Sequence, residues 1–276
     1  MSLRPYLETQ RGGYLSPPDQ LSLDNYRRVW DRGALPRAYW NTALILVPAL
    51  SVTLALSSMI AFAASRFRWR YNVALLALFT AGGMLPQQII INPLRLMYSE
   101  VPLPDALSNS GSLLGSTWGI IIVHIAYQSG FATFVLSNYM KTLPGEVLEA
   151  AVIDGASLWQ QYRRIVLPMV RPALAALGAL QFTWIYNDFF WALILEQQTN
   201  DRPVTSAIGR LAGGFARDNN VIAAVSILMA LPPLIVFVFA GRHLDAFCPS
   251  IAAGTGTPSH GGFLYYDVLE ILQALA

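Results

Sequence analysis

The chain has 276 residues, of which 54% are hydrophobic and only 12% are charged, and its net charge is +2. Soluble globular domains carry about 25% charged residues, so this composition excludes a disordered chain and a nucleic-acid-binding protein and indicates a membrane protein. One cysteine, Cys248, excludes an internal disulfide or zinc cluster, and the only lysine, Lys141, lies in no phosphate-binding loop, so we expect neither a bound metal nor nucleotide hydrolysis.

Charge-free stretches locate the membrane spans, because a helix that crosses the bilayer needs about 20 mostly apolar residues. The sequence predicts an all-α membrane protein with five spans, at residues 40–64, 71–91, 117–137, 172–195 and 219–241. Pro86 predicts a kink or an unwound outer end in the second span, which is expected to end near Pro93, and Pro232-Pro233 predicts a kink in the fifth. Outside the spans lie an N-terminal segment, 1–39, a long connection that we call the elbow, 138–171, and a C-terminal tail, 244–276.

Basic residues predict the orientation of the spans, because cytoplasmic loops are enriched in Arg and Lys. The first connection carries Arg66, Arg68 and Arg70, and the elbow carries Lys141 and three arginines, so we expect both on the cytoplasmic side. Alternation then leaves residues 1–39, with six arginines, outside. Such a segment is unfavourable to translocate without a signal peptide, so we expect the natural chain to have a further N-terminal span before Met1.

The elbow is the connection that mixes charged and apolar residues most freely. Its first part, Glu146 to Ile153, predicts a short helix with Glu146 and Glu149 in the first turn, where the helix dipole favours acids. Gly155 permits a sharp change of direction.

A second short helix is predicted after this glycine, ending at Leu167-Pro168. Its apolar stripe and opposite polar side are expected to be Leu158, Tyr162, Ile165 and Val166 against Gln160, Gln161, Arg163 and Arg164. The pattern allows either a rigid projection that docks on a cytoplasmic partner or an amphipathic linker on lipid head groups.

The letters of the elbow favour the first interpretation. The stretch EAAVIDGASLWQQYRRIVLP resembles the signature loop of ABC-importer permeases, which reads Glu-Ala-Ala, three residues, Gly, nine residues, Ile, one residue, Leu-Pro. Every fixed position is filled, by Glu149, Ala150, Ala151, Gly155, Ile165, Leu167 and Pro168, and the match extends through Asp154, Ala156 and Ser157. The stretches LSLDNYRRVW, MLPQQIIINPL and FTWIYNDFFWALIL are also similar to segments of the carbohydrate-uptake branch, permeases of the maltose type.

This resemblance implies a non-enzymatic transport subunit in a bacterial or archaeal plasma membrane, with a permease domain at 40–243. Its implied partners are a pair of ATPase subunits that use ATP, a second permease and an extracytoplasmic solute-binding protein. Glu146 to Ser157 would be the coupling helix that docks on the ATPase. The family has six spans, so the first is expected to be missing here, and the tail 244–276 does not resemble the family's ending.

Polar residues inside the spans are candidates for a substrate path, since a charge near mid-bilayer costs about 2.5–3.5 kcal/mol. Asp188 lies in the fourth span beside Asn187, and it is either a substrate contact or a structural hydrogen-bond partner. His124 and Gln128 lie four residues apart on the third span, so they share a face, with Tyr127 beside them. His124 is either a path residue or a packed histidine.

Four further residues are weaker candidates. Gln87 and Gln88 follow Pro86 at the predicted break, where polar groups can line a cavity. Trp184 and Tyr186 suit sugar stacking, and an aromatic belt near the membrane surface explains them equally. The partner permease is the alternative location of the sugar site.

Three other functions remain as alternatives. An ABC permease for amino acids, peptides or phosphate would have the same elbow. An ion-coupled secondary carrier predicts acids at mid-membrane and an internal repeat, but the spans carry Asp188 as their only acid and show no repeat. An intramembrane enzyme would need paired acids or a nucleophile with its base, which Asp188 alone does not supply.

Overall fold

The computed structural model describes residues 3, 21–31, 34–67, 72–104, 107–108, 110–196, 203–206 and 219–255, with side chains in the last helix described as far as Phe239. These residues are almost entirely helical, and the extended pairing among them is a bridge between Pro102 and Ser112. The all-α prediction is therefore confirmed for this part of the chain. Most of residues 1–20, Arg68, Arg70 and residues 256–276 lie outside it, so the expectations for those stretches stay predictions.

The described helices follow in chain order. They are α2 (Asp24–Asp31), α3 (Ala34–Arg66), α4 (Asn72–Met84), α5 (Gln87–Glu100), α6 (Thr117–Lys141), α7 (Gly145–Ile153), α8 (Leu158–Gln160), a π-helical turn (Gln161–Val166), α9 (Leu167–Met169), α10 (Arg171–Tyr186), α11 (Phe190–Leu195) and α13 (Asn219–Thr255).

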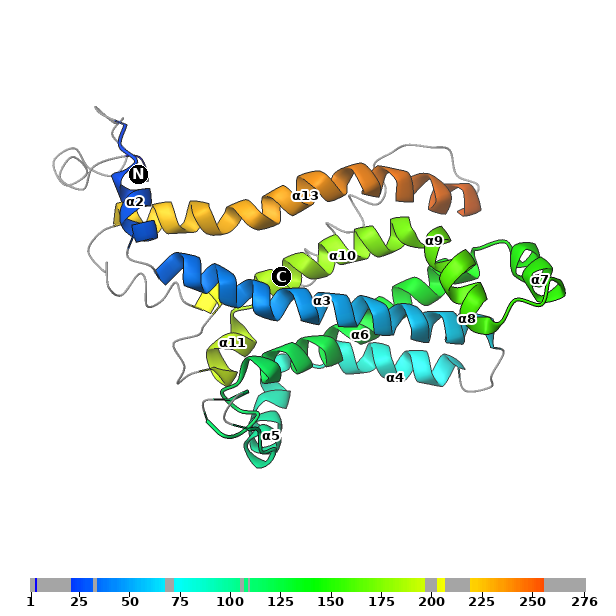
Figure 1. Ribbon diagram of the computed structural model, residues 1–276, viewed down its shortest axis with the longest axis horizontal. Coiled ribbons are helices and arrows are strands. Elements are labelled where there is room, and N and C mark those ends of the chain that lie inside the picture. The colour runs from blue at the N-terminus through cyan, green and yellow to red at the C-terminus, as the bar shows by residue number, and fades with distance from the viewer. Residues whose placement is uncertain are drawn as a thin grey trace.

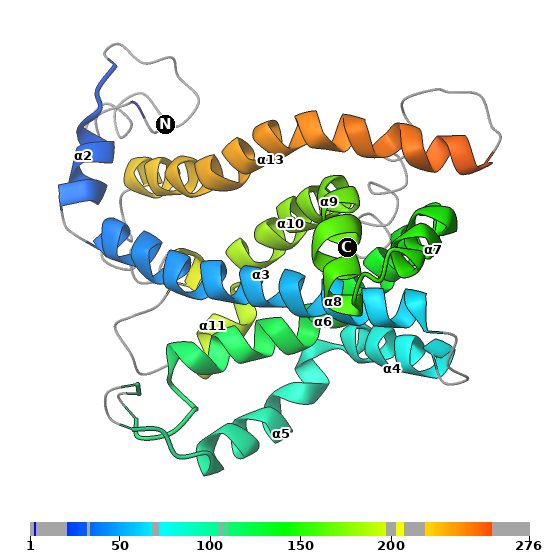
Figure 2. The ribbon, with the colours of Figure 1, turned by 45° about the vertical axis from the view of Figure 1, so that its right-hand side comes forward.

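The long helices run side by side along the molecule, and the short elements gather at its two ends (Figure 1). Helices α2, α5 and α11 lie toward one end, and α7 projects at the other; the turned view shows the same separation (Figure 2). Helix α7, which belongs to the elbow, thus extends beyond the long helices at that end.

Among the described residues, three helices are long and apolar enough to cross a membrane, within α3, α6 and α13. The bent pair Leu158–Met169 and Arg171–Tyr186, whose axes differ by 71°, would make a fourth if it crosses as one span. Three of the five predicted spans are therefore continuous helices. The second is interrupted at Leu85-Pro86 and the fourth at residues 187–189.

The break at Pro86 confirms the predicted interruption, but the expected end near Pro93 is wrong. Helix α5 continues through Pro93 to Glu100. Tyr98 explains the extension, because its side chain is buried and its hydroxyl donates to the Gly119 carbonyl at 3.1 Å, which holds the last turn of α5 against α6. The fifth helix is continuous through Pro232-Pro233, and the kink predicted there stays a prediction.

Close packing joins α4 to α6. An added Cβ on Gly130 of α6 would lie 2.1 Å from the Phe79 carbonyl oxygen of α4, so only glycine fits there without a backbone shift. Small residues at helix contacts are typical of membrane proteins, where backbones approach closely.

Two buried apolar clusters fill the bundle. One contains Leu35, Ile120, Ile185 and Trp191, and the other contains Ala61, Leu136, Tyr162 and Val170. The second cluster includes the elbow residue Tyr162, so the base of the elbow is part of the core. Much of the outward face of α13 is apolar and exposed, at Leu234, Ile235, Phe237, Val238 and Phe239, as expected of a surface in lipid or against another membrane subunit.

Candidate functional site

The first half of the elbow is a projecting helix with little burial. In α7, Glu146 lies in the first turn, and both Glu146 and Glu149 are exposed. The prediction that Glu149 also lies in the first turn is wrong, because the helix begins at Gly145 and Glu149 falls in its second turn. Ala151 is buried, whereas Ile153 is 86% exposed, which is unusual for isoleucine in a folded chain.

The turn after α7 depends on Gly155. Its φ is +76°, a left-handed conformation that residues with a Cβ rarely adopt. The N–H of Gly155 donates to Val152 at 3.0 Å and the N–H of Ala156 donates to Ala151 at 2.9 Å, the two bonds of a Schellman motif. The predicted sharp change of direction is confirmed.

A second helical segment begins at Ser157 with a reciprocal cap. The Ser157 hydroxyl accepts from the Gln160 N–H, and the Gln160 side chain accepts from the Ser157 N–H at 2.8 Å. This capping box satisfies two backbone donors that helix formation would leave unpaired.

The segment ends at Met169, one residue beyond the predicted Leu167-Pro168, and the chain changes direction at Val170. Pro168 lacks an N–H and its ring crowds the carbonyl four residues earlier. The turn before it is correspondingly wide: the Leu167 N–H bonds to Tyr162, five residues back, in a π-helical turn.

The predicted apolar stripe is partly wrong. Tyr162 and Val166 are buried as expected, but Leu158 is exposed and Gln161 is buried. The wide turn alters the helical period on which the stripe was predicted, and Gln161 donates from Nε2 to the Ala156 carbonyl at 2.9 Å, which turns it inward. Ile165 is half-buried, as are Leu167 and Pro168.

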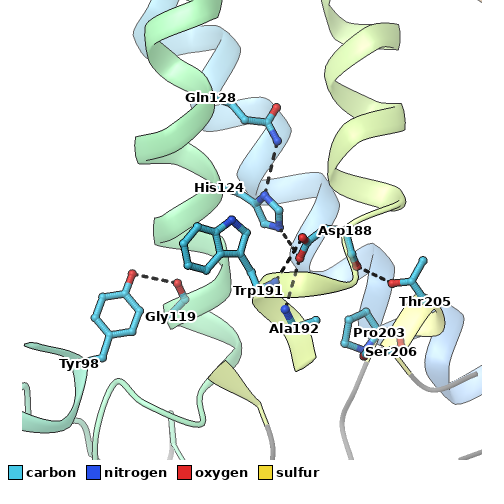
Figure 3. A network of polar contacts seen from close by, with 10 residues as sticks. All are labelled: Tyr98, Gly119, His124, Gln128, Asp188, Trp191, Ala192, Pro203, Thr205 and Ser206. Atoms are coloured by element: carbon cyan, nitrogen blue, oxygen red, sulfur yellow. Dashed lines mark hydrogen bonds and ion pairs between the residues drawn. The ribbon is translucent and has the colours of Figure 1, made fainter. Parts of the chain in front are cut away.

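A second group of polar residues lies within the bundle (Figure 3). His124 Nε2 lies 3.5 Å from Asp188 Oδ2, and His124 Nδ1 lies 3.5 Å from Gln128 Nε2. These three side chains are almost fully buried. The structure therefore confirms that His124 and Gln128 share a face, and it brings Asp188 to the same point.

Asp188 also joins main-chain groups. Its carboxylate accepts from the N–H groups of Trp191 and Ala192, each at 3.3 Å, at the start of α11, and its carbonyl accepts from the Thr205 hydroxyl (Figure 3). An acidic side chain that accepts from the first turn of a helix stabilises that turn. Asp188 thus fixes the break between α10 and α11.

The other predicted residues lie around this network or away from it. The Tyr127 hydroxyl donates to the Leu85 carbonyl at 2.6 Å, so it satisfies a backbone group at the α4–α5 break. Gln87 and Gln88 begin α5 just after this break, half-buried and exposed respectively. Trp184 packs edge-on against Phe131, with centroids 5.1 Å apart.

Asn187 and Tyr186 complete that set. Asn187 is exposed at the end of α10, and it does not join His124 in the described contacts. Tyr186 is buried, stacks on Phe182 at 5.9 Å and donates from its hydroxyl to the Met229 carbonyl at 3.0 Å.

Gln181 and Glu196 are among the buried polar residues that were not predicted. Gln181 of α10 is fully buried and donates to the Gln128 carbonyl at 3.3 Å. Glu196, just after α11, is 1% exposed, and the Thr117 hydroxyl lies 3.5 Å from its Oε1. Gln181 lies four residues before Ile185, so both are on the buried face of α10. This helical spacing is the signal by which the sequence could have identified it.

Comparison with known proteins places this geometry in context. Residues 53–247 match the family described as the inner membrane component of binding-protein-dependent transport systems. A probable ABC transporter permease of Pyrococcus horikoshii is 33% identical, covering 88% of this chain and 85% of its own. A diacetylchitobiose uptake system permease of Streptomyces coelicolor is 27% identical, covering 87% and 76%. In fold, a chain of the crystal structure of a bacterial ABC transporter involved in alginate import superposes with a TM-score of 0.71 at 20% identity, covering 87% of this chain and 86% of that one.

Proposed function

The chain belongs to the family of inner membrane components of binding-protein-dependent transport systems, and from that premise we propose that it is the permease subunit of an ATP-driven importer of sugars or oligosaccharides. The cargo class is supported by the resemblance to carbohydrate permeases and by the diacetylchitobiose relative. The chain is a passive transport subunit in this proposal, and a separate ATPase pair uses the ATP. A second permease and an extracytoplasmic binding protein complete the complex in the inner membrane.

The observation that carries the proposal is the projection of α7 from an otherwise lipid-compatible bundle (Figure 1). Exposed apolar residues, Val152 and Ile153, lie on the same short helix as the exposed acids Glu146 and Glu149. A mixed apolar and acidic surface on a rigid helix suits a groove on a protein partner better than lipid tails. We therefore assign the docking role to α7 and the turn after it, at Ala150, Ala151, Asp154, Gly155, Ala156 and Ser157, with Ile165, Leu167 and Pro168 holding its base.

Asp188 has a structural role in this proposal. Its carboxylate already accepts from two backbone N–H groups, lies beside His124 and is almost fully buried, so these internal partners account for it without a substrate. The same reasoning applies to Tyr127, whose hydroxyl binds Leu85. Of the predicted path residues, Gln88 and Asn187 are the exposed ones and stay the proposed contacts with the cargo.

Co-purification tests the docking role. The chain is expressed with an ABC ATPase subunit from the same organism, and the amount of ATPase retained on the tagged chain is measured in detergent. Glu149→Arg should remove most of it, because a reversed charge at a docked surface adds repulsion to a lost contact. Glu100→Arg is the matched control, since Glu100 is an exposed acid at the far end of α5, and it should retain the ATPase. Equal retention in both variants would contradict the docking role.

Uptake tests the cargo. Reconstituted vesicles are supplied with the binding protein and with labelled disaccharides, amino acids or phosphate in parallel. Accumulation of the disaccharide alone is expected. ATP-dependent accumulation of an amino acid or phosphate would support an ATP-driven importer but contradict a sugar as its cargo. Accumulation driven by an ion gradient without ATP would favour a secondary carrier.

A further inference from the structure

The two halves of the elbow differ in how they meet the bundle. In α7 most side chains are exposed, whereas Gln161, Tyr162 and Val166 of the π-helical turn are buried. The π-helical turn is therefore the most deeply buried part of the elbow and one route by which movement of α7 can reach the membrane helices, beside the packing of Leu148 against the same core cluster.

Tyr162 makes the contact with α3. Its hydroxyl lies 2.7 Å from the Ser58 hydroxyl, and its ring lies 5.5 Å from that of Phe62, one helical turn further along α3. The Ser58 hydroxyl donates its own proton to the Ala55 carbonyl at 2.9 Å. Tyr162 is therefore the donor in the pair, and both protons are used.

A row of bonds connects this contact to the projecting helix. Ala156 donates to Ala151 of α7 at 2.9 Å, and Gln161, next to Tyr162, donates to the Ala156 carbonyl at 2.9 Å. The turn at Gly155 and the π-helical turn are thus tied to each other independently of the chain that joins them.

The contact also leads onward into the bundle. Ser57, next to Ser58, donates to the Ser129 carbonyl of α6 at 3.2 Å. Helix α6 carries Gln128, which accepts from Gln181 of α10. Helices α3, α6 and α10 are therefore connected by buried hydrogen bonds that begin next to Ser58.

We propose that Tyr162, through its hydrogen bond to Ser58, is the positioning residue that transmits displacement of α7 to α3 and α6. This inference rests on the proposed docking of α7 on an ATPase. Both hydroxyls are buried, so few other groups can replace a lost partner, and the bond restricts Tyr162 to one position on α3. π-Helical turns are frequent at functional positions, and Tyr162 lies within this one.

The test uses the complete complex with ATPase, second permease and binding protein in vesicles. Tyr162→Phe removes the hydroxyl and keeps the ring, and Ser58→Ala removes the acceptor. Each should lower cargo transported per ATP hydrolysed by about two- to tenfold, the range expected for one net hydrogen bond, while ATPase retention stays unchanged. The double variant should lose no more than either single variant, because both remove the same bond.

Ser65→Ala is the matched control. Ser65 lies on α3 and its hydroxyl donates to Phe62 three residues back, as that of Ser58 does to Ala55, so it tests the loss of a serine with the same local bond. Transport per ATP should be unchanged in this variant.

Three results would overturn the inference: an unchanged transport ratio in Tyr162→Phe, additive losses in the double variant, or failure of both single variants to assemble, which would give the bond a purely structural role. If instead Glu149→Arg retains the ATPase and the wild-type complex transports, the docking proposal itself fails, which is a separate result.

Discussion

Replacement of Gly155 should weaken transport by acting on the backbone alone. At φ +76°, a residue with a Cβ is strained by roughly 1–2 kcal/mol. No described neighbouring atom lies within 4 Å of an added Cβ at this position, so sterics add nothing to that cost. A change of 1–2 kcal/mol shifts the population of the turn about 5- to 30-fold.

A graded series measures this effect. Cargo-stimulated ATP hydrolysis of the reconstituted complex should fall least in Gly155→Asn, more in Gly155→Ala and most in Gly155→Val. The reason is that Asn tolerates the left-handed region best and a β-branched residue tolerates it worst. Insertion into the membrane, measured by the amount of extracted chain, should stay constant.

Gly145→Ala is the control for this series. Gly145 begins α7, and it too has no described neighbour within 4 Å of an added Cβ, but its φ is not in the left-handed region. Stimulation should be retained. Normal stimulation in all three Gly155 variants, or equal loss in Gly145→Ala, would refute the reasoning.

Two further predictions concern the bundle, each measured as thermal unfolding in detergent. Gly130→Ala should destabilise the chain by about 1–3 kcal/mol, because the added methyl overlaps the Phe79 carbonyl. Gly82→Ala on α4, with open space around it, should be neutral or stabilising. Equal effects of the two substitutions would contradict the close packing of α4 on α6. Asp188→Ala should lower the free energy of unfolding by about 1–3 kcal/mol, because it leaves two N–H groups and His124 without this partner. Asn187→Ala, at an exposed neighbouring position, should change it little. An unchanged stability in Asp188→Ala would contradict the structural role of Asp188.

The features that could be predicted from sequence are those with a strong local cause. Gly155 marks the end of α7 because a left-handed residue after a helix is usually glycine. Pro86 interrupts the second span because it removes a backbone donor. The shared face of His124 and Gln128 follows from the helical repeat.

The features that could not be predicted depend on partners distant in sequence. Tyr98 extends α5 because it binds Gly119, and Gln161 is buried because the π-helical turn changes the helical period. The break at residues 187–189 contains no proline. Its signal is Asp188, an acid whose carboxylate accepts a hydrogen bond from the N–H of Trp191, three residues later.

The docking of α7 on an ATPase is tested most directly by photo-crosslinking. A photo-reactive phenylalanine analogue replaces Ile153, which is 86% exposed on α7, or Leu107, which is 47% exposed in the loop after α5, and the complex is irradiated in membranes. We expect a covalent adduct between this chain and the ATPase from position 153 and none from position 107. A transport-competent complex that gives no adduct at position 153, or equal adducts at both positions, would contradict the account.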